Sequence, residues 1–180
     1  MRTFIAAEIN DEQVLNSIKK IQSDLKIKAK PVSLKNIHFT LLFLGEISDE
    51  MSEKVQNTLS SIEFSPFEVV FEGIGAFPKP KFPRVVWIGI DENGGAKLKD
   101  LARKVEEKLS PLGFHSDKPF KPHITIFRIK NRISDISDEL THANASSLGI
   151  QKISEIKFKK SELTPNGPIY SDLQVVKAKL

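Results

Sequence analysis

Apolar and polar positions in the first quarter of the chain follow two different periods. Residues 3–9 are almost continuously apolar and predict a buried strand. Asn10 or Asp11 can cap a helix, and the apolar residues that follow recur at helical spacing: Val14, Leu15, Ile18, Ile21 and Leu25. Residues 37–44 predict the next strand, and Gly45 ends it. The segment therefore predicts strand, helix and strand in succession.

The next segment predicts a helix, a strand and a loop. Ser48 is the candidate N-cap of a helix whose apolar stripe is Met51, Val55, Leu59 and Ile62. Residues 67–73 alternate well enough for a strand. Residues 75–84 contain prolines and cations and predict a basic loop: Pro78, Pro80 and Pro83 with Lys79, Lys81 and Arg84.

The first pattern then returns. Residues 85–90 predict a buried strand, a helical stripe runs from Leu98 to Leu109, and residues 123–129 predict a further strand. A weaker helix over 133–144 and two final strands over 153–163 and 169–178 follow, with a turn at 164–168. We therefore expect an α+β fold with largely antiparallel sheets, in which units 3–44 and 85–129 are approximate repeats.

Composition narrows the class of protein. The 180 residues are 39% hydrophobic and 28% charged, which predicts one globular domain over 1–180 with two lobes. The absence of cysteine excludes disulfides, thiolate zinc sites, iron–sulfur clusters and cysteine nucleophiles. A net charge of +4 permits a partner that carries phosphate. The N-terminal apolar run is too short for a signal peptide or a membrane span, so we expect a cytoplasmic protein without a membrane partner, by default a monomer.

One short motif occurs in both repeat units. His38-Phe39-Thr40-Leu41 and His123-Ile124-Thr125-Ile126 share the pattern His-x-Thr-aliphatic, and they lie 85 residues apart. Arg2 precedes the first unit and Arg84 the second. In a strand, the histidine and the threonine of each motif share a face while the apolar residues point the other way. Two related lobes would therefore bring two imidazoles and two hydroxyls to one cleft.

This set of side chains suits the cleavage of a phosphodiester without a metal. A neutral imidazole can take a proton from water, and a protonated imidazole can give one to the leaving oxygen. The hydroxyls of Thr40 and Thr125 can donate to the non-bridging phosphoryl oxygens. The residues alone do not decide which histidine is the acid. A metal site would need a third ligand, and no third ligand is repeated with the motifs.

The motifs and their surroundings resemble those of the two-histidine (2H) phosphoesterases, and among them the RNA 2′,3′-cyclic phosphodiesterases, also called 2′-5′ RNA ligases. The resemblance extends over nearly the whole chain and includes segments 2–6, 43–45, 73–78, 83–87, 120–122, 163–165 and 167–170. It implies a bilobal fold with a central cleft, no cofactor, and hydrolysis of RNA 2′,3′-cyclic phosphate ends to 2′-phosphates. It also implies 2′-5′ ligation, RNA 3′ ends such as those of tRNA fragments as partners, His38 as proton donor and His123 as proton acceptor.

Other residues are candidate substrate contacts. Lys35 and Lys121 flank the motifs and can attract phosphate, and Arg84 lies in the basic loop. Phe120 and Tyr170 can stack on a terminal base, or they can belong to the core. Trp87, inside a hydrophobic strand, is expected in the core.

Two positions fit the resemblance less well. Family members often carry a cation two residues after the first threonine, where this chain has Leu42. Arg128 matches a basic position of the family, but it follows His123 by five residues. In a regular strand Arg128 would point away from His123, so it can contact the substrate only if a bulge turns it or if it reaches round the strand end.

Two alternative functions remain open at this point. The same acid–base chemistry could act on a small cyclic nucleotide instead of RNA. The cleft could also bind a nucleotide or an RNA end without turnover, although binding alone does not require two titratable imidazoles.

Overall fold

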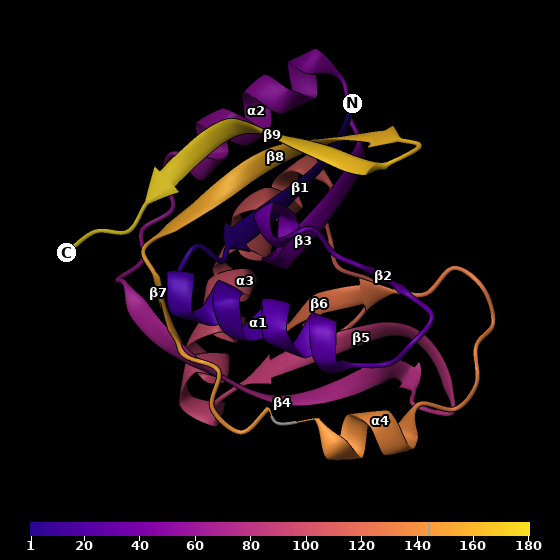
Figure 1. Ribbon diagram of the computed structural model, residues 1–180. Helices are drawn as coiled ribbons and strands as arrows, with labels where there is room; N and C mark the ends of the chain where they lie inside the picture. Colours follow the sequence, from indigo (N-terminus) through magenta and orange to yellow (C-terminus); the bar gives the residue numbers. More distant parts are fainter. Residues whose placement is uncertain (144) are drawn as a thin grey trace.

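The computed structural model describes residues 1–143 and 145–180 (Figure 1). Its elements are, in chain order, β1 (Arg2–Glu8), α1 (Glu12–Asp24), β2 (Lys30–Pro31), η1 (Leu34–Asn36), β3 (His38–Glu46), α2 (Asp49–Leu59), β4 (Phe67–Lys79), β5 (Phe82–Ile90), α3 (Glu92–Leu109), η2 (Ser110–Leu112), β6 (His123–Arg128), α4 (Ser137–His142), β7 (Ile150–Ile153), β8 (Glu155–Thr164) and β9 (Gly167–Lys177).

The strands form two antiparallel sheets. The first has the order β3-β1-β8-β9 and the second β2-β6-β5-β4-β7. Figure 1 shows the first sheet in the upper half of the view and the second in the lower half. In both sheets, the strand that opens a repeat unit (β1 or β5) lies beside the strand that begins with a motif histidine (β3 or β6). The expected α+β class with duplicated units is confirmed.

Side-chain caps begin the three longer helices. Asp11 accepts a hydrogen bond from the Val14 N–H (3.0 Å), and Ser48 accepts one from the Met51 N–H (3.1 Å). Asp91 caps α3 in the same way. Such caps satisfy N–H groups that the first helical turn leaves unpaired. They fix where each helix starts after its strand, as the sequence predicted for α1 and α2.

The two lobes share one hydrophobic core. Helix α1 contacts β6 and β7 of the second sheet, whereas α3 contacts β3 of the first sheet and β4 of the second. The rings of Phe39 (β3) and Phe71 (β4) stack with their centroids 5.7 Å apart, and both side chains are fully buried. A single cluster of buried residues therefore joins both sheets to the helices. Among the described residues, no helix is long and apolar enough to cross a membrane.

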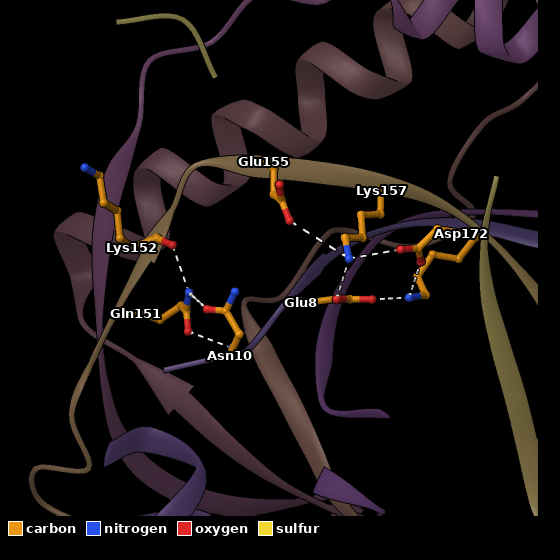
Figure 2. Close-up of polar contacts among 8 residues, drawn as sticks. Glu8, Asn10, Gln151, Lys152, Glu155, Lys157 and Asp172 are labelled. Carbon is orange, nitrogen blue, oxygen red and sulfur yellow. Dashed lines mark hydrogen bonds and ion pairs between the residues drawn. The ribbon is translucent and has the colours of Figure 1, made fainter. Parts of the chain in front are cut away.

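A buried amide completes the junction between α1 and β7. The Gln151 side chain, 5% exposed, accepts hydrogen bonds from the backbone N–H groups of Asn10 and Asp11, at 3.0 and 2.8 Å. It donates to the Asn10 side chain and to the Lys152 carbonyl (Figure 2). β7 itself, like the short β2, was not expected from the sequence, because four residues give too short a pattern to identify a strand.

The prediction of a basic loop over 75–84 is wrong. β4 continues to Lys79 and β5 begins at Phe82, so this segment is the end of a β-hairpin. Pro78 pairs with Pro83 across the hairpin, so the two residues that lack an N–H face each other. The proline content therefore suggested a loop where strands are present.

Apart from β7, the C-terminal third differs from the expectation in its boundaries. The helix expected over 133–144 is shorter, spanning Ser137–His142, and its expected end at residue 144 lies outside the described residues. β8 and β9 both come closer to the turn than expected. Gly167 begins β9 and adopts a φ of 114°, a conformation open to glycine.

Candidate active site

Each motif strand carries a β-bulge at the residue after its threonine. Along β1 and β3, Ala6 pairs with Thr40 and Ile5 with Leu42, which leaves Leu41 without a partner. Along β5 and β6, Trp87 pairs with Thr125 and Val86 with Phe127, which leaves Ile126 without one. An extra residue of this kind reverses the alternation of faces beyond it. The two units therefore share the bulge as well as the motif.

The bulges decide which later residues accompany the histidines. We call the side of each sheet that carries His38 and Thr40, or His123 and Thr125, the histidine face. Arg128 pairs with Val85, which alternates with Trp87 opposite Thr125, so Arg128 lies on the histidine face. The structure therefore contains the bulge that Arg128 needs in order to share a sheet face with His123.

The first sheet places a phenylalanine where the second has this arginine. Leu42 is 3% exposed and belongs to the core, so it is not the position that matches Arg128. Phe43 is 65% exposed and pairs with Phe4, whose ring contacts His38. Leu42 therefore offers no contact to a phosphate, and beyond the bulge it is Phe43 that reaches the histidine face.

Both imidazoles are oriented by the same backbone contact. Nδ1 of His38 donates to the carbonyl of Asn36 at 2.7 Å, and Nδ1 of His123 donates to the carbonyl of Lys121 at 2.5 Å. A carbonyl can only accept, so Nδ1 carries the proton and the neutral rings present Nε2 without one. Nε2 of His38 lies 3.0 Å from the Thr40 hydroxyl. Each ring therefore has Nε2 as its titrating atom.

Burial makes both histidines poor bases in the free protein. Desolvation lowers the pKa of His38 to about 4; the Asn36 carbonyl opposes the shift, and the charges of Lys159 and Arg128 add to it. Burial also lowers the pKa of His123, which is less enclosed. The charge of Arg128 thus reaches from the second sheet to the first, and the two motif strands, β3 and β6, contact each other.

Aromatic rings surround both imidazoles. The His38 ring lies 5.1 Å from the Phe4 ring and 5.5 Å from the Tyr170 ring, which it meets edge-on. The His123 ring meets Phe77 edge-on at 5.1 Å. The sequence pointed to Tyr170 but missed Phe4 and Phe77, whose apolar character gives no sign of contact with a histidine.

A cluster of charged groups lies on the first sheet: Glu8, Glu155, Lys157, Lys159 and Asp172 (Figure 2). Lys157 contacts Glu8 at 2.9 Å and Asp172 at 3.0 Å. Lys159, with a side chain only 7% exposed, contacts the same two carboxylates. Burial would raise the pKa of Glu8, but the two ammonium groups hold it below its usual value. Because Glu8 pairs with His38 across the strands, the cluster sets the charge next to this imidazole.

The remaining candidates lie in different surroundings. Lys35 on η1 and Lys121 before β6 are exposed, and the Lys121 ammonium lies 5.5 Å from the centre of the Phe77 ring. Arg84 is exposed and is the unpaired residue of a bulge in β5. Phe120 packs against the core, which favours a place in the core over stacking on a terminal base.

The expectation that Trp87 lies in the core is also wrong. Its neighbours Val86 and Ile88 are fully buried in the core, so Trp87 alternates to the histidine face opposite Thr125. The ring covers Gly75, where a Cβ atom would lie 2.2 Å from it, and it lies 5.3 Å from the Phe77 ring. Only glycine leaves room for the indole there. Within 1–143 and 145–180, no group of three or more His, Cys, Asp or Glu side chains could hold a metal ion.

Comparisons with known proteins identify the family of the chain. The chain is 43% identical over 178 residues to an RNA 2′,3′-cyclic phosphodiesterase of Archaeoglobus fulgidus, covering 97% of this chain and 99% of that protein. It is 36% identical over 173 residues to an enzyme of the same name from Methanocaldococcus jannaschii, covering 94% and 96%.

Solved structures show the same fold. TT0787 of Thermus thermophilus superposes with a TM-score of 0.80 at 28% identity, over 98% of this chain and 97% of that one. Escherichia coli LigT in complex with 3′-AMP gives a TM-score of 0.79 at 24% identity, over 99% and 98%. The profile of the LigT-like phosphoesterases matches twice, at residues 9–87 and 88–170. The chain therefore belongs to the LigT-like phosphoesterase family.

Proposed function

We propose that the protein hydrolyses RNA 2′,3′-cyclic phosphate ends to 2′-phosphates. The observation that carries the proposal is the pair of histidines with the same Nδ1 anchor, each followed by a threonine and a bulge, on two strands, β3 and β6, that contact each other. The names of the two relatives described above specify this substrate for those proteins. An imidazole pair with unprotonated Nε2 atoms suits proton transfer on both sides of one phosphorus.

In the proposed reaction, His123 is the base and His38 the acid. Nε2 of His123 accepts a proton from the attacking water, whose oxygen bonds to phosphorus. The bond from phosphorus to the 3′-oxygen breaks, and His38 gives its Nε2 proton to that oxygen. His38 takes up this proton when the substrate binds, because the phosphate anion raises the pKa that burial had lowered. A buried imidazolium is also the stronger acid, which suits the donor role.

Side chains on the histidine face would hold the phosphate. Thr40 and Thr125 can donate to the non-bridging oxygens, and Arg128 can neutralise their charge. The exposed ring of Phe43 and the Tyr170 ring beside His38 offer apolar surface to the terminal nucleoside. All the groups that the reaction requires come from the chain, so we propose that no metal takes part.

The test is hydrolysis of an oligonucleotide with a 2′,3′-cyclic phosphate end, in the presence of EDTA. We expect turnover by the wild type and a loss of about 10²–10⁴-fold for His38→Asn and for His123→Asn. His142→Asn is the matched control, because this exposed histidine also bonds a carbonyl through Nδ1. Full activity of the His38 and His123 variants, or an inactive wild type, would contradict the proposal.

The equivalent anchoring of the two histidines also supports the reverse type of reaction. If His38 and His123 exchange roles, a 5′-hydroxyl end can be joined to the cyclic phosphate through a 2′-5′ bond. The test adds an RNA acceptor with a 5′-hydroxyl and looks for a product that resists a nuclease specific for 3′-5′ bonds. The absence of such a product at high acceptor concentration would count against ligation.

A further inference from the structure

The end of the β4–β5 hairpin presents an exposed aromatic ring among cations. The Phe82 side chain is 46% exposed. Three cations surround the ring: the Lys79 ammonium at 5.3 Å from its centre, the Lys81 ammonium at 6.0 Å and the Arg132 guanidinium carbon at 5.8 Å. We call these four residues the hairpin patch. Exposed rings among cations are what proteins use to bind single-stranded nucleic acid.

The hairpin patch continues the histidine face of the second sheet. Phe77 lies on this face, because it pairs with Val85 and its ring meets His123. Beyond the bulge at Arg84, Pro83 is buried as Val86 is, so Phe82 alternates to the histidine face, and Lys79 pairs with Phe82. Two residues of strand span about 7 Å at most. The patch therefore begins within about 7 Å of the row of Phe77 and Arg128, on the same side of the sheet.

Backbone hydrogen bonds hold the patch together. The N–H of Ile129 donates to the Arg84 carbonyl at 2.9 Å, and the N–H of Ile136 donates to the Pro80 carbonyl at 3.0 Å. The Ile136 side chain is 3% exposed. The segment that carries Arg132 is thus fixed against the hairpin at both ends, so the backbone that carries the ring and its cations is in place before a ligand arrives.

One carboxylate lies at the edge of the patch. Asp135 accepts hydrogen bonds from the N–H and the hydroxyl of Ser137, at 2.8 and 2.5 Å. These bonds lower the pKa of Asp135, and the charge of Lys81 adds to the effect. Asp135 carries one negative charge against three positive charges, so it offsets only part of the charge of Lys79, Lys81 and Arg132.

We infer that the hairpin patch binds the single-stranded RNA on the 5′ side of the terminal nucleotide. One base stacks on Phe82, and the cations contact backbone phosphates. The inference rests on the proposed function: a cyclic phosphate held by the histidines is the 3′ end, so all other nucleotides lie on its 5′ side. The path from His123 past Arg128 to Phe82 gives them a continuous face.

The test compares two substrates, a nucleoside 2′,3′-cyclic monophosphate and an oligonucleotide ending in the same nucleotide. Stacking on one aromatic ring corresponds to about a five- to 150-fold effect on affinity. We expect Phe82→Ala to raise KM for the oligonucleotide within this range and to leave kcat/KM for the mononucleotide unchanged. Phe82→Trp should keep the wild-type KM. Ile150→Ala, which truncates a 49% exposed side chain on β7, is the control.

Salt dependence tests the cations. Each lost contact to a phosphate should reduce the slope of log affinity against log salt concentration by about 0.7 for a single strand. Lys81→Ala should show this reduction, whereas Lys19→Ala, exposed on α1, should not. Binding is measured by the fluorescence anisotropy of an oligonucleotide with a 2′-phosphate end, which requires no turnover.

The outcomes separate this inference from the proposed function. An unchanged KM and salt slope in the Phe82→Ala and Lys81→Ala variants, with both substrates hydrolysed by the wild type, would overturn the inference alone. Equal losses on both substrates would overturn it too, because the effect would not depend on RNA length. Binding that needs Phe82, in a protein that hydrolyses neither substrate, would support the patch and contradict the proposed function.

Discussion

At the scale of single residues, the two motif histidines share an anchor but differ in environment. Each donates through Nδ1 to the carbonyl two residues before it. His38 is enclosed by Phe4, Tyr170 and the charged cluster, and its pKa falls to about 4, whereas His123 is more accessible. The same motif thus places two imidazoles in different environments, and burial lowers the pKa of both.

The buried His38 should make stability depend on pH. Its pKa is about 4 in the folded protein and about 6.5 in the unfolded chain, so the unfolded state binds more protons between these values. The stabilisation is fully present above pH 6.5 and is lost as the pH falls towards 4. The loss is on the order of 3 kcal/mol.

Urea unfolding at several pH values between 7 and 4 measures this effect. His38→Asn keeps a donor towards the Asn36 carbonyl but cannot take up a proton, so its free energy of unfolding should fall less with pH than that of the wild type. Glu8 and Asp172 are common to both proteins and cancel in the comparison. Parallel curves for the two proteins would show that His38 is not held neutral by the fold.

At the scale of elements, the bulges in β3 and β6 determine which side chains join the histidines. Without the unpaired Ile126, Arg128 would point into the core side of the second sheet. The corresponding Leu41 in β3 turns Phe43 outward and Leu42 inward. One extra residue per strand therefore places a cation on one face and an aromatic ring on the other.

Removing the Arg128 charge should be detectable at His38. Because this guanidinium lowers the pKa of His38 from across the two sheets, Arg128→Ala should raise that pKa. NMR titration of the His38 ring measures the shift, with Lys19→Ala as a control for net charge. An unchanged titration in Arg128→Ala would mean that the bulge does not bring the arginine towards the first sheet.

At the scale of the whole molecule, the repeat units do not have separate cores. Residues of both sheets belong to one buried cluster, and the stack of Phe39 on Phe71 crosses from β3 to β4. A shared core couples the positions of the two histidine strands. We infer that this is how two units keep their imidazoles in a fixed relation.

A change in the first sheet should therefore unfold the second. Phe39→Ala removes a fully buried ring and should cost about 3–5 kcal/mol. Trp87, the only tryptophan, lies in the second sheet, so its fluorescence reports on that sheet. Fluorescence and far-UV circular dichroism should shift to the same lower urea midpoint. Phe43→Ala, in the same strand but exposed, should cost much less, and two separate transitions would contradict a common core.

Hydrophobic periodicity and capping residues were enough to predict most of the fold. They gave the helices and strands of both repeat units, because each element buries a continuous apolar face that is visible in sequence. The duplicated His-x-Thr motif pointed to His38, Thr40, His123 and Thr125, around which the candidate site is built. Periodicity failed at 75–84, where prolines occur inside paired strands, and at β7, which is only four residues long.

The sequence by itself determined the elements, the repeat and the paired motif, since these depend on residues close together in the chain. Only the tertiary structure decided that Arg128 and Phe43 lie on the histidine faces of the two sheets, because a bulge depends on pairing with a distant strand. It also decided the charged cluster beside His38, whose members come from β1, β8 and β9. Burial and pairing arise from the whole fold, so the acidity of His38 could not be predicted from local sequence.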